Sequence, residues 1–198
     1  MMIRIRCFPL LTVIGLLLGS GLTTISQAAT WDIDQLMHNL AQTRSGHASF
    51  VETKSIAMLD QPIESSGELF YSAPDRLEKH TVKPKPELMV VDGDNLLIER
   101  GRQKYHLQLQ SYPELAAFID SVRGTLAGDR TALERIYQLS LEGSPQSWTL
   151  QLVPISAKMK RVVTRIRIAG ASDEVHSIDI TQADGDSSQM RIEKLTTP

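Results

Sequence analysis

Cysteine is nearly absent from this sequence, because Cys7 is the only one among 198 residues. It precedes a short apolar run near the amino terminus, in a segment that we expect to be removed. The mature chain would then contain no cysteine. This excludes a disulfide framework, a thiol nucleophile and a thiolate metal site, even in an exported protein.

Catalytic motifs are also missing. The 5 histidines form neither an H-E-x-x-H motif nor a close pair that could chelate zinc. There is no G-x-S-x-G nucleophile motif and no glycine-rich phosphate loop. Asp184, Gly185 and Asp186 lack the spaced acidic series of a calcium loop, so we interpret them as a hairpin turn. We therefore predict a protein that is not an enzyme and has no metal site and no cofactor.

Long hydrophobic runs are absent as well. The longest, residues 10–18, falls short of the roughly 18–20 apolar residues that a membrane-spanning helix needs. Arg4 and Arg6 precede it, and small residues follow, which is the layout of a secretory signal peptide. We predict cleavage after Ala28, with Ala29 as the alternative site. A membrane anchor is the competing interpretation of this segment.

The remaining chain, residues 29–198, has a length that suits one domain with its own core. Without Arg4 and Arg6, 19 basic residues stand against 23 acidic ones, a net charge of −4. Nucleic-acid binding depends on neutralising phosphates, so this acidic balance argues against a nucleic-acid partner.

Residues 32–42 have the periodicity of an amphipathic helix. Ile33, Leu36, Met37 and Leu40 fall at i, i+3, i+4 and i+7, which places them in one apolar stripe. We expect this helix to cover one face of a sheet.

A second helical region begins near residue 111. Ser111, Pro113 and Glu114 have the spacing of a capping box with proline in the first turn. We expect this helix to end at Gly128, and a second short helix to begin near Thr131. The predicted stripe of the first helix consists of Leu115, Phe118, Ile119, Val122 and Leu126.

The rest of the chain predicts short antiparallel strands. Apolar and polar residues alternate, and turns rich in glycine, proline and aspartate separate the runs. Residues 76–82 are more polar and predict either an edge strand or a strand with one wet face. We count about ten strands, and a sheet this long tends to curl. The predicted fold is α+β: a curled antiparallel sheet that forms an incomplete β-barrel, with a helical lid on its concave side.

Several short sequences in the first half of the chain resemble the LolA family of periplasmic lipoprotein carriers. The family has a pattern close to G-x-L-x-[YVF]-x-x-P-x-[RL], followed by L-[IM]-V-[SV]-D-G and a short hydrophobic strand. The matching words are HASF at 47–50, GELFY at 67–71, PDRL at 74–77, LMVVDG at 88–93 and LLI at 96–98. The resemblance extends over nearly the whole mature chain and implies the same half-barrel.

The chain departs from the family pattern at one functional position. The family places an arginine immediately before the proline of the strand-end turn, where it holds the lid and promotes handover of the cargo. This chain has Ala73 at that position, and Arg76 is the nearest basic residue. We therefore predict that Arg76 takes the lid and handover role.

The resemblance implies a periplasmic carrier that holds the acyl chains of lipoproteins, or another lipid, and moves them towards the outer membrane. It implies an inner-membrane donor complex and an outer-membrane acceptor as partners, and we expect a monomer. A periplasmic lipid-binding sensor module without transfer activity is the alternative, and a small periplasmic enzyme is a third. The predicted lipid-binding residues are Leu36, Leu40, Phe50, Leu69, Tyr71, Leu77, Leu107, Leu109, Phe118, Ile119 and Val122.

Overall fold

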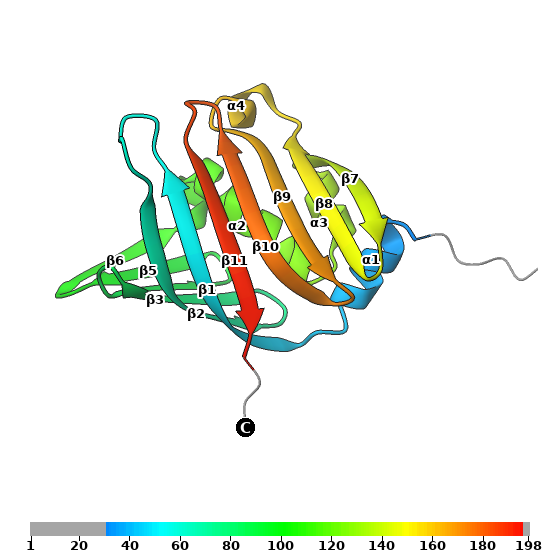
Figure 1. Ribbon diagram of the computed structural model, residues 1–198, viewed down its shortest axis with the longest axis horizontal. Coiled ribbons are helices and arrows are strands. Elements are labelled where there is room, and N and C mark those ends of the chain that lie inside the picture. Colours follow the sequence, from blue (N-terminus) through cyan, green and yellow to red (C-terminus); the bar gives the residue numbers. More distant parts are fainter. Residues whose placement is uncertain (1–30, 196–198) are drawn as a thin grey trace, which may run out of the picture. The chain divides into compact units, whose positions relative to one another are not determined.

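The computed structural model describes residues 31–195, and the predicted signal peptide with its cleavage site lies outside them. The described part forms one antiparallel sheet of eleven strands with helices on one side (Figure 1). The strands are β1 (Ser45–Ser55), β2 (Ile63–Ser72), β3 (Arg76–Lys83), β4 (Glu87–Asp92), β5 (Asn95–Arg100), β6 (Gln103–Gln108), β7 (Tyr137–Ser144), β8 (Ser147–Pro154), β9 (Val163–Ala171), β10 (Glu174–Gln182) and β11 (Ser187–Lys194). The helices are α1 (Ile33–Leu40), η1 (Leu109–Ser111), α2 (Pro113–Leu126), α3 (Arg130–Glu134) and α4 (Ala157–Lys160).

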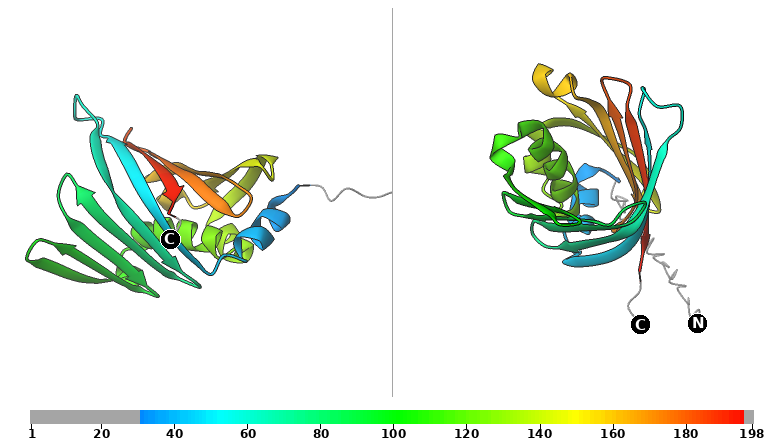
Figure 2. Two further views of the ribbon diagram at one scale, coloured as in Figure 1. Left: turned by 60° about the horizontal axis from the view of Figure 1, so that its bottom comes forward. Right: turned by 90° about the vertical axis from the view of Figure 1, so that its left-hand side faces the viewer.

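The strand order explains why the barrel is incomplete. The order is β6-β5-β4-β3-β2-β1-β11-β10-β9-β8-β7, so the first and last strands pair at the centre and β6 and β7 form the two edges. The chain leaves the sheet at one edge and returns at the other, through η1, α2 and α3. These helices lie on the concave side, with α2 inside the curve of the sheet (Figure 2). The predicted curled, open sheet with a helical cover is confirmed.

Alternation along the strands sorts side chains between the two faces of the sheet. In β8, Trp148, Leu150 and Leu152 are buried, and the residues between them are more exposed. This is the pattern of a sheet with one dry and one wet face. The edge-strand interpretation of residues 76–82 is wrong, because β3 pairs with β2 and with β4. Arg76, Glu78 and His80 alternate with Leu77 and Lys79 along β3 and form its wet face.

Two helices begin close to their predicted positions, and the start of α2 differs from the prediction. Asp32 caps α1 and accepts a hydrogen bond from the backbone N–H of Gln35. Ser111 is not the N-cap of α2, because it belongs to η1, and Tyr112 occupies the cap position. The short helix expected near Thr131 is α3, which begins at Arg130 and ends at Glu134, and Tyr137 already begins β7.

Two hydrophobic clusters pack between the sheet and the helices. The larger joins α1, α2 and α3 to strands β7–β10, and it contains the fully buried Leu36, Leu150 and Ile166. The smaller joins α2 to β4, β5 and η1 through Val91, Leu96, Leu109 and Ile119. Phe118 of α2 packs against both clusters. α2 thus contributes one buried side chain to each cluster, Ala117 to the larger and Ile119 to the smaller.

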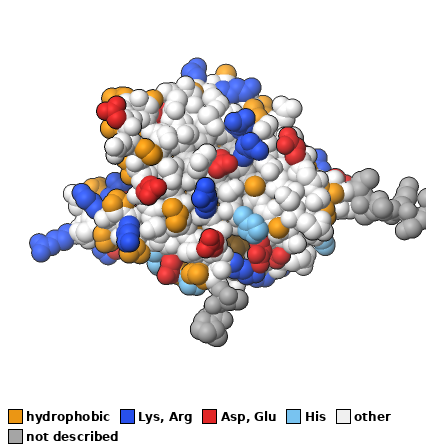
Figure 3. Space-filling view, in the orientation of Figure 1, with side chains coloured by type: hydrophobic (Ala, Val, Ile, Leu, Met, Phe, Trp, Pro, Cys, Tyr) orange, Lys and Arg blue, Asp and Glu red, His pale blue; other side chains and the backbone are white. Residues whose placement is uncertain are grey.

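The surface and the helices add two observations. On the face shown in Figure 3, basic and acidic side chains are interspersed, and hydrophobic side chains are scattered rather than gathered. Within residues 31–195, none of the helices has the length and apolar character needed to cross a bilayer.

Candidate functional site

A cavity of about 260 Å³ lies between α2 and the central strands of the sheet. Residues of both hydrophobic clusters border it, among them Val91 and Ile168, and apolar side chains form most of its wall. The apolar residues that line it are Ala48, Leu69, Phe70, Tyr71, Leu77, Met89, Val91, Phe118, Ile119, Val122, Leu126, Ile168, Val175, Ile178, Met190 and Ile192.

Six of the eleven residues predicted to bind lipid line this cavity. They come from two walls of different origin, three from strands β2 and β3 and three from α2. Residues at i and i+2 of a strand point to the same face, and residues at i, i+1 and i+4 of a helix share one side. The six are Leu69, Tyr71, Leu77, Phe118, Ile119 and Val122.

The other five predicted residues lie outside the cavity wall. Leu36 and Leu40 of α1 are buried in the larger hydrophobic cluster. Leu109 is buried in the smaller cluster, with Leu107 packed against it. Phe50 is buried on β1, where the ammonium group of Lys79 lies 4.8 Å from the centre of its ring. In the sequence these residues have the same periodicity as cavity residues, so pattern alone does not separate the two groups.

α2 is anchored to the β7 edge by a buried tyrosine. The hydroxyl of Tyr137 donates a hydrogen bond of 3.0 Å to the carbonyl oxygen of Ala117. Burial raises the pKa of Tyr137 to about 12, so the hydroxyl keeps its proton at neutral pH. Within the helix, Ser121 and Thr125 are also buried and donate to the carbonyls of Phe118 and Ser121. The polar groups on this side of α2 are therefore satisfied locally.

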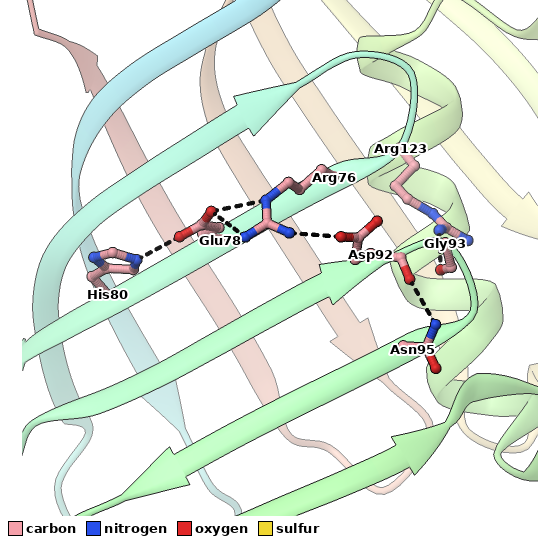
Figure 4. Close-up of polar contacts among 7 residues, drawn as sticks. All are labelled: Arg76, Glu78, His80, Asp92, Gly93, Asn95 and Arg123. Carbon is pink, nitrogen blue, oxygen red and sulfur yellow. Dashed lines mark hydrogen bonds and ion pairs between the residues drawn. The ribbon is translucent and has the colours of Figure 1, made fainter.

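On its other side, α2 is held to the sheet by Arg123. The guanidinium donates a hydrogen bond of 2.6 Å from Nη1 to the carbonyl oxygen of Gly93, in the turn between β4 and β5 (Figure 4). Nη2 bonds to Asp120, one helical turn earlier, which fixes the orientation of the guanidinium. The Arg123 side chain is only 15% exposed. The guanidinium of Arg123 thus contacts the turn at the end of the LMVVDG segment.

Arg76, the predicted lid residue, makes contacts of a different kind. Its guanidinium lies 2.6 Å from Asp92 and 2.9 Å from Glu78, and Glu78 in turn lies 2.9 Å from His80 (Figure 4). The hydrogen bonds from His80 and then Arg76 hold the pKa of Glu78 below its usual value. Among the described residues, every hydrogen bond of Arg76 ends on the sheet. Its role in handover stays a prediction.

The lid contact of Arg123 and the wall residues of β10 and β11 were missed in the sequence. Arg123 directly follows Val122 of the apolar stripe and has Asp120 three positions earlier, which was the available signal. The contribution of Met190 and Ile192 depends on β11 pairing with β1, a contact between the two ends of the chain. No local pattern reports such a pairing.

Polar groups in and around the cavity do not converge as a metal site would require. Within the described residues, no group of three histidine, cysteine, aspartate or glutamate side chains is placed to hold a metal ion. At one end of the cavity, Asp173 accepts a hydrogen bond from Thr43 and Glu174 pairs with Lys194. These polar side chains are thus paired with one another.

The geometry defines a class of protein: an open antiparallel half-barrel whose helical cover encloses an apolar binding cavity. The model of the outer membrane lipoprotein carrier protein LolA-like family matches residues 25–193. The chain belongs to this family. It is also 24% identical over 165 residues to an outer-membrane lipoprotein carrier protein of Dechloromonas aromatica (strain RCB), covering 82% of this chain and 76% of the relative.

Solved structures with a similar fold include three proteins of low sequence identity. A LolA superfamily protein of Nitrosomonas europaea has a TM-score of 0.45 at 10% identity, over 85% of this chain and 96% of that one. The Pseudomonas aeruginosa MucA/MucB complex contains a chain with a TM-score of 0.48 at 12% identity, over 85% and 59%. The Mycobacterium tuberculosis lipoprotein LppX has a TM-score of 0.46 at 12% identity, over 81% and 91%.

Proposed function

We propose that this protein is a periplasmic carrier that binds the acyl chains of lipoproteins, or of another lipid, and moves them through water towards the outer membrane. Membership of the LolA-like family and the lipoprotein carrier relative support this function. The observation that carries it is the apolar cavity between α2 and the sheet. Burial of each CH₂ group there would contribute about 0.8 kcal/mol to binding.

The size of the cavity implies that α2 moves when cargo enters. Sites for small molecules measure roughly 300–1,000 Å³. The present cavity, about 260 Å³, is smaller than that range. A long acyl chain therefore needs the cover to open, and the same motion would allow release.

The seam that opens is the one between α2 and strands β4 and β5. On that side Ile119 is the buried side chain that α2 contributes, and Ile119 also lines the cavity. On its opposite side α2 is joined to β7 by the buried hydrogen bond from Tyr137 to Ala117 and packs against α1 and α3, so we expect the side that faces β4 and β5 to separate first. The hydrogen bond from Arg123 to Gly93 crosses this weaker seam and acts as its latch.

Removal of the latch should speed the exchange of ligand. A hydrogen bond to a charged group contributes about 1.5–3 kcal/mol, so we expect Arg123→Met to raise the release rate of a bound fluorescent fatty acid about tenfold. Stopped-flow displacement by unlabelled lipid measures this rate. The exposed Arg135 at the end of α3 provides the control, and Arg135→Met should release ligand at the wild-type rate. Equal rates for the two variants would contradict the latch.

The carrier function itself is tested by native mass spectrometry and lipid extraction on protein purified gently from periplasm, followed by a transfer assay. A bound acyl species that passes to acceptor membranes is the expected result. A stable protein partner without any transfer would instead indicate a sensor module. A protein that never carries an acyl group would overturn the proposal.

A further inference from the structure

A carboxylate and an ammonium group lie on the concave, largely apolar face of the sheet. Glu52 of β1 is only 4% exposed, and it follows Ala48 and Phe50 in the inward-facing alternation of that strand. Its carboxylate forms an ion pair with Lys79 of β3, whose side chain is 21% exposed and which lines the cavity. A charged pair in this position needs an explanation, because desolvating two charges costs several kcal/mol per ion.

The oxygens of Glu52 are fully used. Oε1 accepts from the hydroxyl of Ser188 at 2.7 Å and lies 3.4 Å from the ammonium of Lys54. Oε2 accepts from Lys79 and, at 3.4 Å, from the hydroxyl of Ser65. The pKa of Glu52, although raised by burial, is lowered overall by Lys79, Ser188 and Lys54, so the group is ionised at neutral pH. Two lysines therefore surround one carboxylate, and the cluster has an excess positive charge.

Lys79, by contrast, has unused hydrogen-bonding capacity. An ammonium group carries three N–H donors, and among the described residues Glu52 is the one hydrogen-bond acceptor of Lys79. The ammonium lies over the ring of Phe50, which holds it against the sheet by a cation–π contact. The carboxylate and the ring thus fix Lys79 beside the cavity, and two of its donors are left for a ligand.

We propose that Lys79 binds the anionic headgroup, carboxylate or phosphate, of an acyl ligand whose chain occupies the cavity, and that Glu52 positions Lys79 for this contact. The inference rests on the proposed function, and it deepens that function by naming anionic amphiphiles as the favoured cargo. The chain would pack on Leu69, Leu77 and Met190, and its head would lie at the excess positive charge. Charge-assisted hydrogen bonds are about twice as strong as neutral ones, so the headgroup contact would select cargo.

The buried pair is a poor candidate for a purely stabilising feature. Well-packed apolar residues in place of a buried ion pair are often neutral or stabilising, whereas loss of one partner is strongly destabilising. The test therefore uses three variants. Lys79→Met removes the donor. Glu52→Gln removes the competing negative charge but keeps an amide oxygen that can accept from Lys79 and hold it in place. Glu52→Gln/Lys79→Met removes both charges together so that neither is left unpaired.

The experiment compares three palmitoyl probes, namely palmitate, lysophosphatidic acid and the uncharged monopalmitoylglycerol, by calorimetric titration of the purified protein. The ratio of anionic to neutral affinity is measured within each variant, so a change in folding affects both terms equally. We expect Lys79→Met and the double variant to lower this ratio about tenfold, and Glu52→Gln to raise it. Lys85→Met, in an exposed turn, is the control and should leave the ratio unchanged.

The outcomes separate this inference from the carrier function. If all three probes bind the wild-type protein and the ratio is the same in every variant, the headgroup role of Lys79 is overturned and the carrier function stands. If no probe binds the wild-type protein, the cavity is not an acyl site and both proposals fail. The anionic probe whose affinity falls most in the double variant identifies carboxylate or phosphate as the preferred group.

Discussion

Leu77→Glu is expected to weaken the binding of acyl ligands at least about 100-fold, because a carboxylate in the cavity either stays unpaired against the acyl chain or keeps water there at a cost of several kcal/mol. Leu77 lines the cavity and pairs in register with Tyr71 of β2 and Val91 of β4, both of which also line it. A charge at this position therefore faces the centre of the sheet wall. Titration with a fluorescent fatty acid measures the loss.

The same strand offers a matched control. Val82 of β3 is 60% exposed and does not line the cavity, so Val82→Glu adds the same charge to the same strand on a wet site. We expect Val82→Glu to bind ligand like the wild-type protein. Thermal unfolding checks that both variants fold, since Leu77 is only partly buried in the ligand-free protein. Unchanged binding by a folded Leu77→Glu protein would remove this cavity as the acyl site.

Much of the fold was predictable because its determinants are local. Hairpins follow one another along the chain, and turns such as the one at Gly93 interrupt clear alternation. The stripe that contains Phe118 and Val122 places α2 against an apolar surface. Such signals need only neighbours in sequence, which is why the half-barrel and its cover could be expected before the structure.

The site was less predictable because it depends on contacts between distant segments. A cavity and a core have the same periodicity, so Leu40 and Leu69 looked equivalent in sequence, but only Leu69 lines the cavity. The pair of Glu52 and Lys79 joins β1 to β3 across the intervening β2. Even the contact of Arg123 with Gly93 depends on α2 passing over the β4–β5 turn. These features follow from the topology of the sheet and have no local signature.

Gly67→Ala is expected to destabilise the protein by about 3 kcal/mol or more, among the largest effects of a single methyl group. β2 is offset against β3 between Ser66 and Gly67, and this irregularity brings the two backbones unusually close. A Cβ atom on Gly67 would lie 1.9 Å from the carbonyl oxygen of His80 and 2.9 Å from the Cα of Thr81. Both obstacles are backbone atoms, so no change of side-chain rotamer relieves the clash, and the strands must separate.

Gly46→Ala on β1 is the matched control for this effect. Its Cβ would meet nothing closer than the Cβ of Tyr71 at 3.9 Å, which is ordinary contact. Loss of glycine's freedom in the unfolded chain should leave this variant equal to the wild-type protein or more stable by about 0.4–1 kcal/mol. Urea denaturation of both variants measures the change in the free energy of unfolding, from the shift of the midpoint at an unchanged slope. Because β3 carries Leu77 and Lys79, a folded Gly67→Ala protein should also bind ligand poorly. Equal stability of the two alanine variants would show that the close approach at Gly67 is not required.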